Sequence, residues 1–113
     1  MPSAFIDDGY SLRATIKSEA GTFDEFDIVY RPMEAGESAE LIAKTDKLPW
    51  SVYSQARSEW VAKKLISWTL IRSNNSPVEI TPKTVLKLLD EALHVVWKHV
   101  SGELPGAEEP SKN

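Results

Sequence analysis

An amphipathic stretch near the end of the chain most constrains how this sequence can fold. Thr81-Pro82 places a capping hydroxyl before a proline at the first helical position, where the missing N–H costs nothing. Gly102 is well placed to end the helix. Between these signals, apolar residues follow the three-and-four spacing of one helical face: Val85, Leu89, Ala92, Leu93, Val96 and Val100. The pattern predicts one helix from Thr81-Pro82 to Gly102, with a face that must be buried.

Two short alternating segments in the first third of the chain predict a β-hairpin. Apolar and polar residues alternate along residues 10–17, and again along residues 25–31. Gly21 lies in the short connection and can take a positive φ, which favours an antiparallel pairing of the two segments. Pro32 ends the second strand. Because a lone hairpin is only marginally stable in water, we expect helices to cover its apolar face.

Two more helices are predicted between the hairpin and the last helix. Residues 34–47 favour a short, exposed helix with little to bury. After Pro49, Ser51 is the expected N-cap of a helix that runs to about Thr69. An apolar stripe from Val52 to Trp68 is expected to be buried, and Ile66 lies on the far side, so the helix is apolar on two sides, as a central helix would be. The predicted fold is therefore α+β, an N-terminal antiparallel β-hairpin followed by about three α-helices packed as a small helical domain. Residues 1–102 form this single domain, and residues 103–113 are expected to be a flexible acidic tail.

Composition excludes several classes of protein. The chain of 113 residues has the size of one domain, and it contains no cysteine for a disulfide, a thiolate metal site or a cysteine nucleophile. The net charge of −4 argues against binding to nucleic acid through phosphate contacts. No basic and apolar leader and no membrane-length apolar run are seen, so we expect a cytoplasmic protein that does not bind membranes.

Charge is distributed unevenly along the chain. Residues 1–48 hold ten acids and five bases, whereas residues 49–101 hold four acids and seven bases. An acidic first half joined to a basic second half could attract itself or line copies up head to tail. A solvated surface is the alternative, and we favour it because no charge cluster is dense enough to define a binding face.

The polar residues do not suggest catalysis. There is no Gly-x-Ser-x-Gly setting for a serine nucleophile and no glycine-rich phosphate loop. His94 lies four residues after Asp90, which suits a helical ion pair, and His99 lies in a last turn, where a cation suits the helix dipole. We therefore expect structural histidines, no cofactor and a protein that is not an enzyme.

An acidic group of residues raises the question of a metal site. Carboxylates from both ends of the predicted hairpin could meet and hold a hard cation: Asp7, Asp8, Asp24, Glu25 and Asp27. However, no loop has the ligand spacing of a known calcium site, and charges at strand edges commonly prevent edge-to-edge aggregation. We favour this protective role and expect no metal.

The four tryptophans are the main signal of a binding surface. Trp60 and Trp68 lie at helical spacing beside apolar residues and are expected in the core. For Trp50 and Trp97, core and surface positions remain equally open. The residues predicted to contact a partner polypeptide or a second copy are Trp50, Tyr53, Arg57 and Trp97.

The order of several short motifs resembles a known family. The hairpin ends in Tyr30-Arg31-Pro32-Met33, a predicted helix closes on Ile66-Ser67-Trp68, and Ile80-Thr81-Pro82 opens the final helix. This order resembles the small tail assembly chaperones of long-tailed bacteriophages and prophages. Thr69 stands where members of that family often carry an acidic residue.

The resemblance implies a role in tail morphogenesis. Such proteins are thought to coat the helical tape measure protein in the host bacterial cytoplasm until tail tube protein displaces them, and some also exist as a longer frameshifted form. The alternative is a small structural virion protein of the head-tail joining or tail completion type. A transcription regulator is disfavoured because no helix presents a basic recognition face, and an adaptor domain from a bacterial chromosome remains a further possibility.

Overall fold

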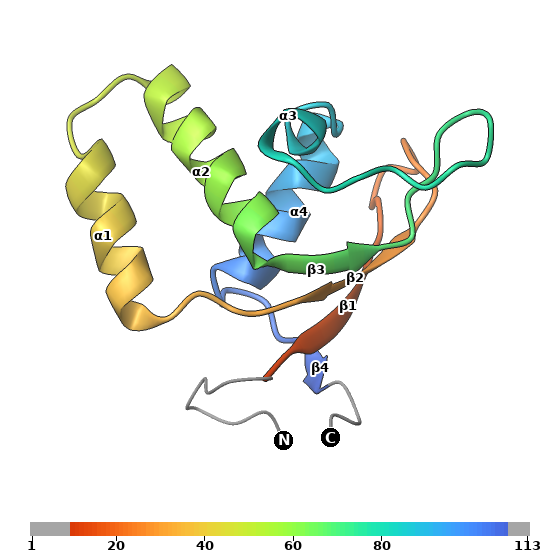
Figure 1. Cartoon of the computed structure of the whole chain (residues 1–113), viewed down its shortest axis with the longest axis horizontal. Helices are drawn as coiled ribbons and strands as arrows, with labels where there is room; N and C mark the ends of the chain where they lie inside the picture. The colour runs from red at the N-terminus through yellow and green to blue at the C-terminus, as the bar shows by residue number, and fades with distance from the viewer. Residues whose placement is uncertain (1–9, 109–113) are drawn as a thin grey trace.

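The structure, a computed structural model, describes residues 10–108 and confirms the predicted α+β class. Strands and helices follow in the order β1 (Leu12–Ile16), β2 (Phe26–Tyr30), α1 (Ala35–Thr45), α2 (Trp50–Lys64), β3 (Leu65–Trp68), α3 (Pro82–Val85), α4 (Asp90–Val100) and β4 (Ala107–Glu108). The helices gather on one side of a small twisted sheet, as Figure 1 shows.

The sheet is antiparallel and has the strand order β3-β2-β1-β4. Its centre is the predicted hairpin, in which Leu12 pairs with Tyr30 and Ile16 pairs with Phe26. Gly21 has a φ of +74° in the connection between the strands, as expected for the residue that turns the chain. One face of the hairpin is buried and the other is largely exposed, which is the usual arrangement for an antiparallel sheet.

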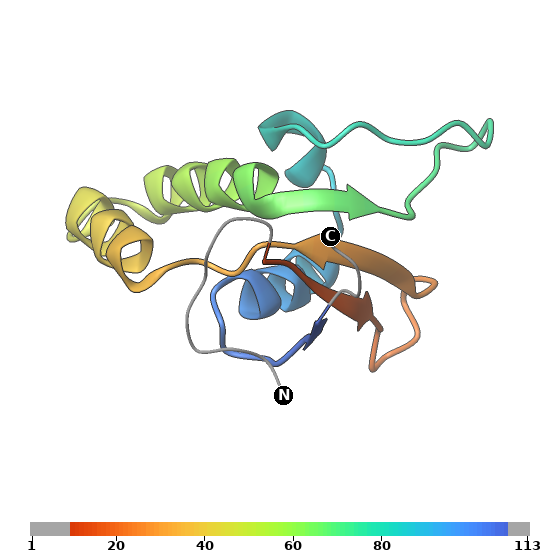
Figure 2. The same cartoon turned by 60° about the horizontal axis from the view of Figure 1, so that its bottom comes forward.

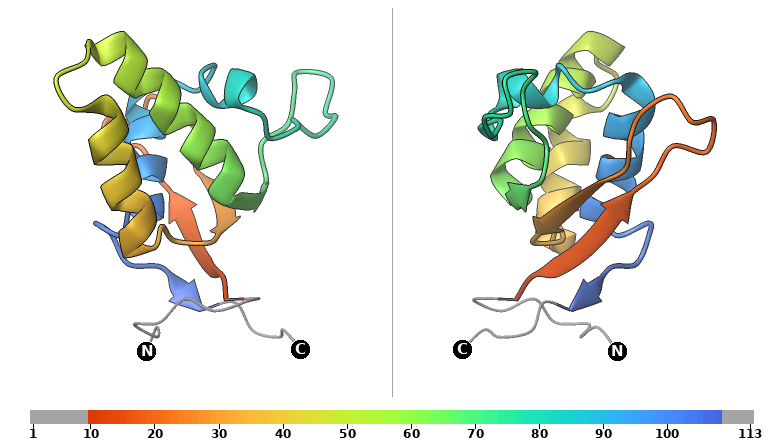
Figure 3. Two further views of the ribbon diagram at one scale, coloured as in Figure 1. Left: turned by 60° about the vertical axis from the view of Figure 1, so that its left-hand side comes forward. Right: turned by 90° about the vertical axis from the view of Figure 1, so that its right-hand side faces the viewer.

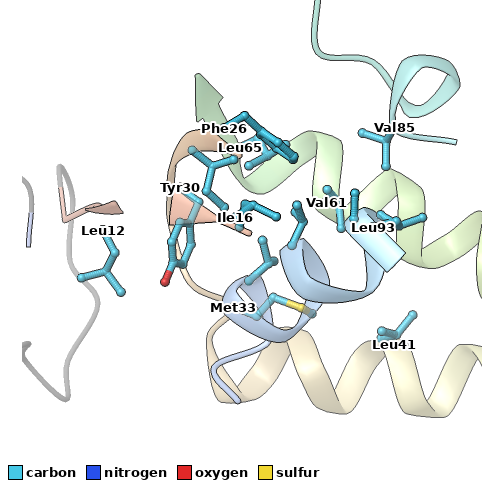
Figure 4. Packing of buried hydrophobic residues seen from close by; sticks show 14 residues of the cluster. Leu12, Ile16, Phe26, Tyr30, Met33, Leu41, Val61, Leu65, Val85 and Leu93 are labelled. Carbon is cyan, nitrogen blue, oxygen red and sulfur yellow. The ribbon is translucent and has the colours of Figure 1, made fainter. Parts of the chain in front are cut away.

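Helix α4 covers the buried face of the sheet. Val96 and Val100 of α4 and Ile16 and Ile28 of the hairpin are completely buried. The Met33 amide donates a hydrogen bond to the Val100 carbonyl, at 2.9 Å, and fixes the end of α4 against the chain that leaves β2. Figure 4 shows apolar side chains of the sheet, α2 and α4 converging in this core. Five residues of the predicted stripe are buried as expected, namely Val85, Ala92, Leu93, Val96 and Val100, whereas Leu89 is 54% exposed and that part of the prediction is wrong.

Helix α2 ends earlier than predicted, at Lys64, and the chain continues directly into β3. The Arg31 amide donates to the Lys64 carbonyl at 2.9 Å, and the Thr69 amide donates to the Asp27 carbonyl at 3.1 Å. Leu65–Trp68 therefore form a strand because they pair with the open edge of β2, although their apolar spacing also suited a helix. Pro49, not Ser51, occupies the N-cap position of α2.

The predicted last helix is two helices with a break between them. The Thr84 amide donates to the Thr81 hydroxyl at 3.1 Å, which confirms the predicted cap, but α3 ends at Val85. Helix α4 then begins after Leu89. The break allows α3 to pack on α2 while α4 packs on β1. Gly102 has a φ of +91° and follows the end of α4, as predicted.

The prediction of a separate tail is wrong for residues 103–108. Ala107 pairs with Arg13 and Glu108 with Leu12, so β4 adds a fourth strand beside β1. The Leu104 amide donates to the Lys98 carbonyl at 3.0 Å and holds the turn that leads there. In Figure 2 this segment passes beneath α4 before it reaches the sheet. Residues 109–113 of the predicted tail lie outside the described residues.

Candidate partner-binding surface

An exposed apolar surface lies at the corner where α1 turns into α2. Ile42 is 66% exposed, Leu48 48%, Trp50 64% and Val52 43%. We call these four residues the α1–α2 corner; it lies at the end of the molecule remote from the loop after β3 (Figures 1 and 3). Val52 was predicted to lie in the buried stripe of α2, and this prediction is wrong because α1 leaves that part of α2 uncovered.

An ion pair joins the first turn of α1 to the end of α2, at the end of α1 away from the corner. Lys64, the last residue of α2, places its ammonium nitrogen 2.7 Å from a carboxylate oxygen of Glu37, in the first turn of α1. The same carboxylate accepts a hydrogen bond from the Glu34 amide at 2.8 Å. Within α1 only Leu41 and Thr45 are buried, both in its second half, so few side chains of this helix pack against the rest of the molecule.

The pKa of Glu37 reports this anchoring. Burial alone would raise the pKa of this carboxyl, but the hydrogen bonds from Lys64 and the Glu34 amide and the charges of Lys64 and Lys63 lower it below the ordinary value of 4.5. The carboxylate is therefore ionised at neutral pH, and the ion pair is formed there.

Three of the four predicted contact residues form one cluster on α2. The rings of Trp50 and Tyr53 have centroids 5.2 Å apart. The guanidinium carbon of Arg57 lies 5.2 Å from the centre of the Trp50 ring and 5.9 Å from that of Tyr53. These residues are spaced by three and four positions, so they share one side of the helix. The cluster holds the Trp50 indole in place while most of its surface stays in water.

Arg57 is the buried member of this cluster. It is only 5% exposed, and its Nε atom has no hydrogen-bond partner among residues 10–108. A buried guanidinium without full hydrogen bonding gains from the electron-rich ring faces that cover it. Arg57 is therefore better placed to orient Trp50 than to touch a partner.

Trp97 lies apart from this cluster. It is half-buried on α4 and packs against the hydrophobic core, and the described residues show no ring or cation contact between it and the other three. Trp60 and Trp68 are also half-buried against the core, as predicted, and the Trp68 indole donates to the Val78 carbonyl at 2.8 Å.

A groove separates α1 from α2 beside the corner. Its volume is about 440 Å³, and its lining mixes polar and small apolar side chains: Lys44, Thr45, Ser51, Val52, Gln55, Ala56 and Glu59. Ile42, Leu48 and Val52 were not among the contact residues predicted from the sequence. The sequence did contain a signal for their exposure. The helix predicted over residues 34–47 had few apolar residues to bury, so it could not cover the start of the next helix.

The histidines differ from expectation. His94 is exposed, and no salt bridge joins it to Asp90 in the part of the chain that the structure describes. His99 is buried, and its ring contacts Tyr30 edge-on with centroids 6.0 Å apart. Burial lowers the pKa of His99 below 6.5, although a hydrogen bond to the backbone of Pro105 acts in the opposite direction. His99 is therefore neutral at pH 7, and it does not serve as a cation at the end of the helix.

One carboxylate connects the hairpin loop to α4. Glu91, in the first turn of α4, accepts hydrogen bonds from the Thr22 hydroxyl at 2.7 Å, the Ser18 hydroxyl at 3.0 Å and the Glu19 amide at 3.2 Å. The bond from Thr22 lowers the pKa of Glu91 most; the bonds from Ser18 and Glu19 add to this effect, and desolvation partly opposes it. Glu91 thus holds the loop of the β1–β2 hairpin in place, a contact that the sequence did not predict.

Two further findings concern metals and membranes. Within residues 10–108, no three side chains of His, Cys, Asp or Glu gather closely enough to hold a metal ion. Asp7 and Asp8, two of the five acidic residues weighed as metal ligands from the sequence, lie outside the described residues. No described helix has both the length and the apolar character needed to cross a membrane.

No protein-family model, curated protein or solved structure matches this chain. The motifs behind the resemblance to tail assembly chaperones have definite places in the fold. Thr81-Pro82 begins a helix, as in the expected pattern, whereas the pair Ser67-Trp68 lies in β3 and not at a helix end.

Proposed function

We propose that this chain is a non-enzymatic binding protein whose α1–α2 corner holds an apolar helix face of another polypeptide. The proposed partner is the tape measure protein of a long-tailed phage or prophage, so that the chain acts as a tail assembly chaperone in the host cytoplasm. The partner's identity comes from the sequence resemblance, and the binding surface comes from the geometry of the corner.

The observation that most supports the proposal is that Trp50 is exposed and is also held by its neighbours. Its indole is 64% exposed, yet Tyr53 and Arg57 hold it in one orientation. Tryptophan is enriched among residues that dominate binding energy, and a ring that is already ordered loses little conformational entropy on binding. Ile42, Leu48 and Val52 extend the apolar area around it, as a surface that receives an amphipathic helix requires.

The small size of the corner suits a reversible contact. Four exposed side chains cannot bury the area of a permanent interface, so each contact should be weak and its release fast. A chaperone that is later displaced by tail tube protein needs this property. Several copies along one long helical client would then protect its apolar surface together.

The proposal is tested by co-expressing the chain with the tape measure protein of the same phage or prophage. We expect the wild-type chain to keep the tape measure protein in the soluble fraction and to co-purify with it. Trp50→Ala should weaken co-purification roughly tenfold to thirtyfold, in line with the loss of an interface tryptophan. Ile66→Thr is the control, because Ile66 is 54% exposed but lies on β3.

Two results would contradict the proposal. One is an equal yield of complex from the wild type and from Trp50→Ala. The other is the presence of the chain in purified, complete virions at a fixed copy number, which would favour the structural virion protein instead.

A further inference from the structure

We propose that the α1–α2 corner of one copy docks into a groove at the opposite end of a second copy, so that the free protein associates head to tail. This inference rests on the proposed function in one respect, the use of the corner as a binding surface. It adds a second partner for that surface, the protein itself, and with it a means of regulation.

The receiving groove lies between the hairpin loop, the end of β3 and the turn that joins α3 to α4. It has a volume of about 480 Å³ and is lined by Phe23, Asp24, Glu25, Phe26, Thr69, Leu70, Ile71, Lys87, Leu88, Leu89 and Ala92. A second hollow of about 380 Å³ adjoins it and shares Leu70, Ile71, Lys87 and Leu88. We call the two together the distal groove.

The distal groove is apolar where an inserted side chain would rest. Phe26 and Ala92 are buried at its base, and Leu70 and Leu88 are half-buried in its walls. Ile71 is 59% exposed and Leu89 54% exposed at its rim. Apolar rim residues of this size are stabilised when another apolar surface covers them.

Charges at the two ends of the molecule are complementary. Asp24, Glu25 and Lys87 border the distal groove, and Arg72 also borders it but is paired with Glu79. The residues between Ile42 and Leu48 of the corner carry the opposite pattern, with two bases, Lys44 and Lys47, and one acid, Asp46.

Of these charged side chains, the six other than Arg72 and Glu79 form no salt bridge within residues 10–108, where the ion pairs are Lys64–Glu37 and Arg72–Glu79. All six are exposed. A second copy can therefore satisfy both sets of charges at once, with lysines against the acidic side of the groove and an aspartate against its lysine.

Placement in the fold makes the contact intermolecular. The corner and the distal groove lie at opposite ends of a molecule whose two longer extents are 40 and 38 Å (Figures 1 and 2). One copy therefore cannot fill its own groove. A contact between two different surfaces is heterologous, and it produces open chains of copies unless the rotation between neighbours closes a ring.

Self-association of this kind would protect the exposed tryptophan before a partner is present. Client and second copy compete for the same corner, so client binding should dissolve the chains. Before a client is present, self-association would keep the corner covered, whereas an exposed apolar surface favours non-specific aggregation.

The test uses two variants of the full chain that each lack one surface. The corner variant is Ile42→Ser with Leu48→Ser, and the groove variant is Ile71→Ser with Leu89→Ser. All four side chains are largely exposed, and serine at the N-cap position of Leu89 suits the start of α4. Ile66→Thr again serves as the control, and circular dichroism verifies that each variant is folded.

Sedimentation velocity over a wide range of concentration supplies the measurement. For the wild type and the control, we expect the weight-average sedimentation coefficient to rise with concentration. Either double variant alone should weaken association roughly tenfold or more. An equimolar mixture of the two variants should form a 1:1 dimer and nothing larger, because one retains the groove and the other retains the corner.

The inference is overturned if the wild type stays monomeric, if the groove variant associates as the wild type does, or if the mixture of the two variants stays monomeric. The groove variant keeps its corner, so its co-purification with the tape measure protein tests the proposed function separately. Client binding without self-association would contradict this inference alone. Self-association through both surfaces without client binding would contradict the proposed function alone.

An exchange of charges tests the pairing of the two ends. Asp24→Lys with Glu25→Lys should weaken association, and so should Lys44→Glu with Lys47→Glu. A mixture of these two variants should associate again, through the acidic corner of one and the basic groove of the other. High salt should weaken association of the wild type.

Discussion

A Cβ atom placed on Gly106 would lie 2.5 Å from the hydroxyl oxygen of Tyr30, so glycine is what allows the chain to pass this buried ring on its way into β4. The same Cβ would lie 3.1 Å from the Arg13 carbonyl oxygen and 3.1 Å from the Leu12 Cβ. Tyr30 is completely buried, so its close-packed surroundings leave the ring little room to move aside. The fourth strand of the sheet therefore depends on the close approach of Gly106 to Tyr30.

Gly106→Ala should destabilise the protein by about 1–3 kcal/mol, the usual cost of overpacking a filled site. The matched control is Gly36→Ala, because a Cβ at Gly36 meets nothing within 4 Å and the residue lies in helix α1. That change should stabilise the protein by about 0.5–1 kcal/mol. Urea unfolding measures both, and equal effects of the two substitutions would contradict the assigned contact.

Tyr30→Phe should cost little stability and should partly rescue Gly106→Ala. The Tyr30 hydroxyl is buried without a hydrogen-bond partner among the described residues, and burial, with a smaller effect of Tyr10, raises the pKa of Tyr30 to about 12. Removal of an unsatisfied buried hydroxyl is close to neutral. A loss of several kcal/mol in Tyr30→Phe, measured by urea unfolding, would instead indicate a partner for this hydroxyl.

Lys64→Met should lower the free energy of unfolding by about 1–3 kcal/mol. The Lys64 side chain is 7% exposed and the Glu37 side chain 20%, so removal of the lysine leaves a partly buried carboxylate with fewer partners. Lys83→Met is the control, because Lys83 is exposed and lies on α3. In a double-mutant cycle with Glu37→Gln, purely additive effects would show that the ion pair contributes nothing.

Stability should fall in two steps as the pH is lowered. The pKa of His99 is below 6.5 in the folded protein, so the unfolded chain binds its proton first, and stability falls as the pH drops from 6.5 toward the folded value. The pKa values of Glu37 and Glu91 are below 4.5, so their contribution is present above pH 4.5 and is lost below it.

Urea unfolding at a series of pH values measures these steps. His99→Gln should remove the upper step and leave the lower one. Glu37→Gln should flatten the lower step. An unchanged upper step in His99→Gln would assign it to another group.

Trp97→Ala and Trp50→Ala should act differently on stability. Trp97 packs against the core, so its truncation should cost about 2–4 kcal/mol, whereas Trp50 is largely exposed and should cost less than about 1 kcal/mol. Thermal unfolding distinguishes the two variants. A normal melting temperature in Trp97→Ala would show that Trp97 contributes little to the core, and it would favour a role for this residue in partner contact.

The sequence alone determined the parts of the fold that depend on neighbouring residues. Alternation defined the strands that became β1 and β2, and Gly21 supplied the turn between them. The capping hydroxyl of Thr81 and the positive φ of Gly102 are confirmed for the same reason, since each depends only on the residues of its own helix end. The cluster of Trp50, Tyr53 and Arg57 is also local, because its members share one helix.

Only the tertiary structure decided the features that depend on pairing between distant segments. Leu65–Trp68 could have prolonged a helix, but the free edge of β2 offers hydrogen bonds that turn it into β3. Ala107–Glu108 has little apolar surface of its own, but β1 supplies a strand to pair with. The break between α3 and α4 and the exposure of Val52 arise likewise from where other elements lie. Local patterns define which conformations a segment can adopt, whereas backbone hydrogen bonds and packing from remote parts of the chain select among them.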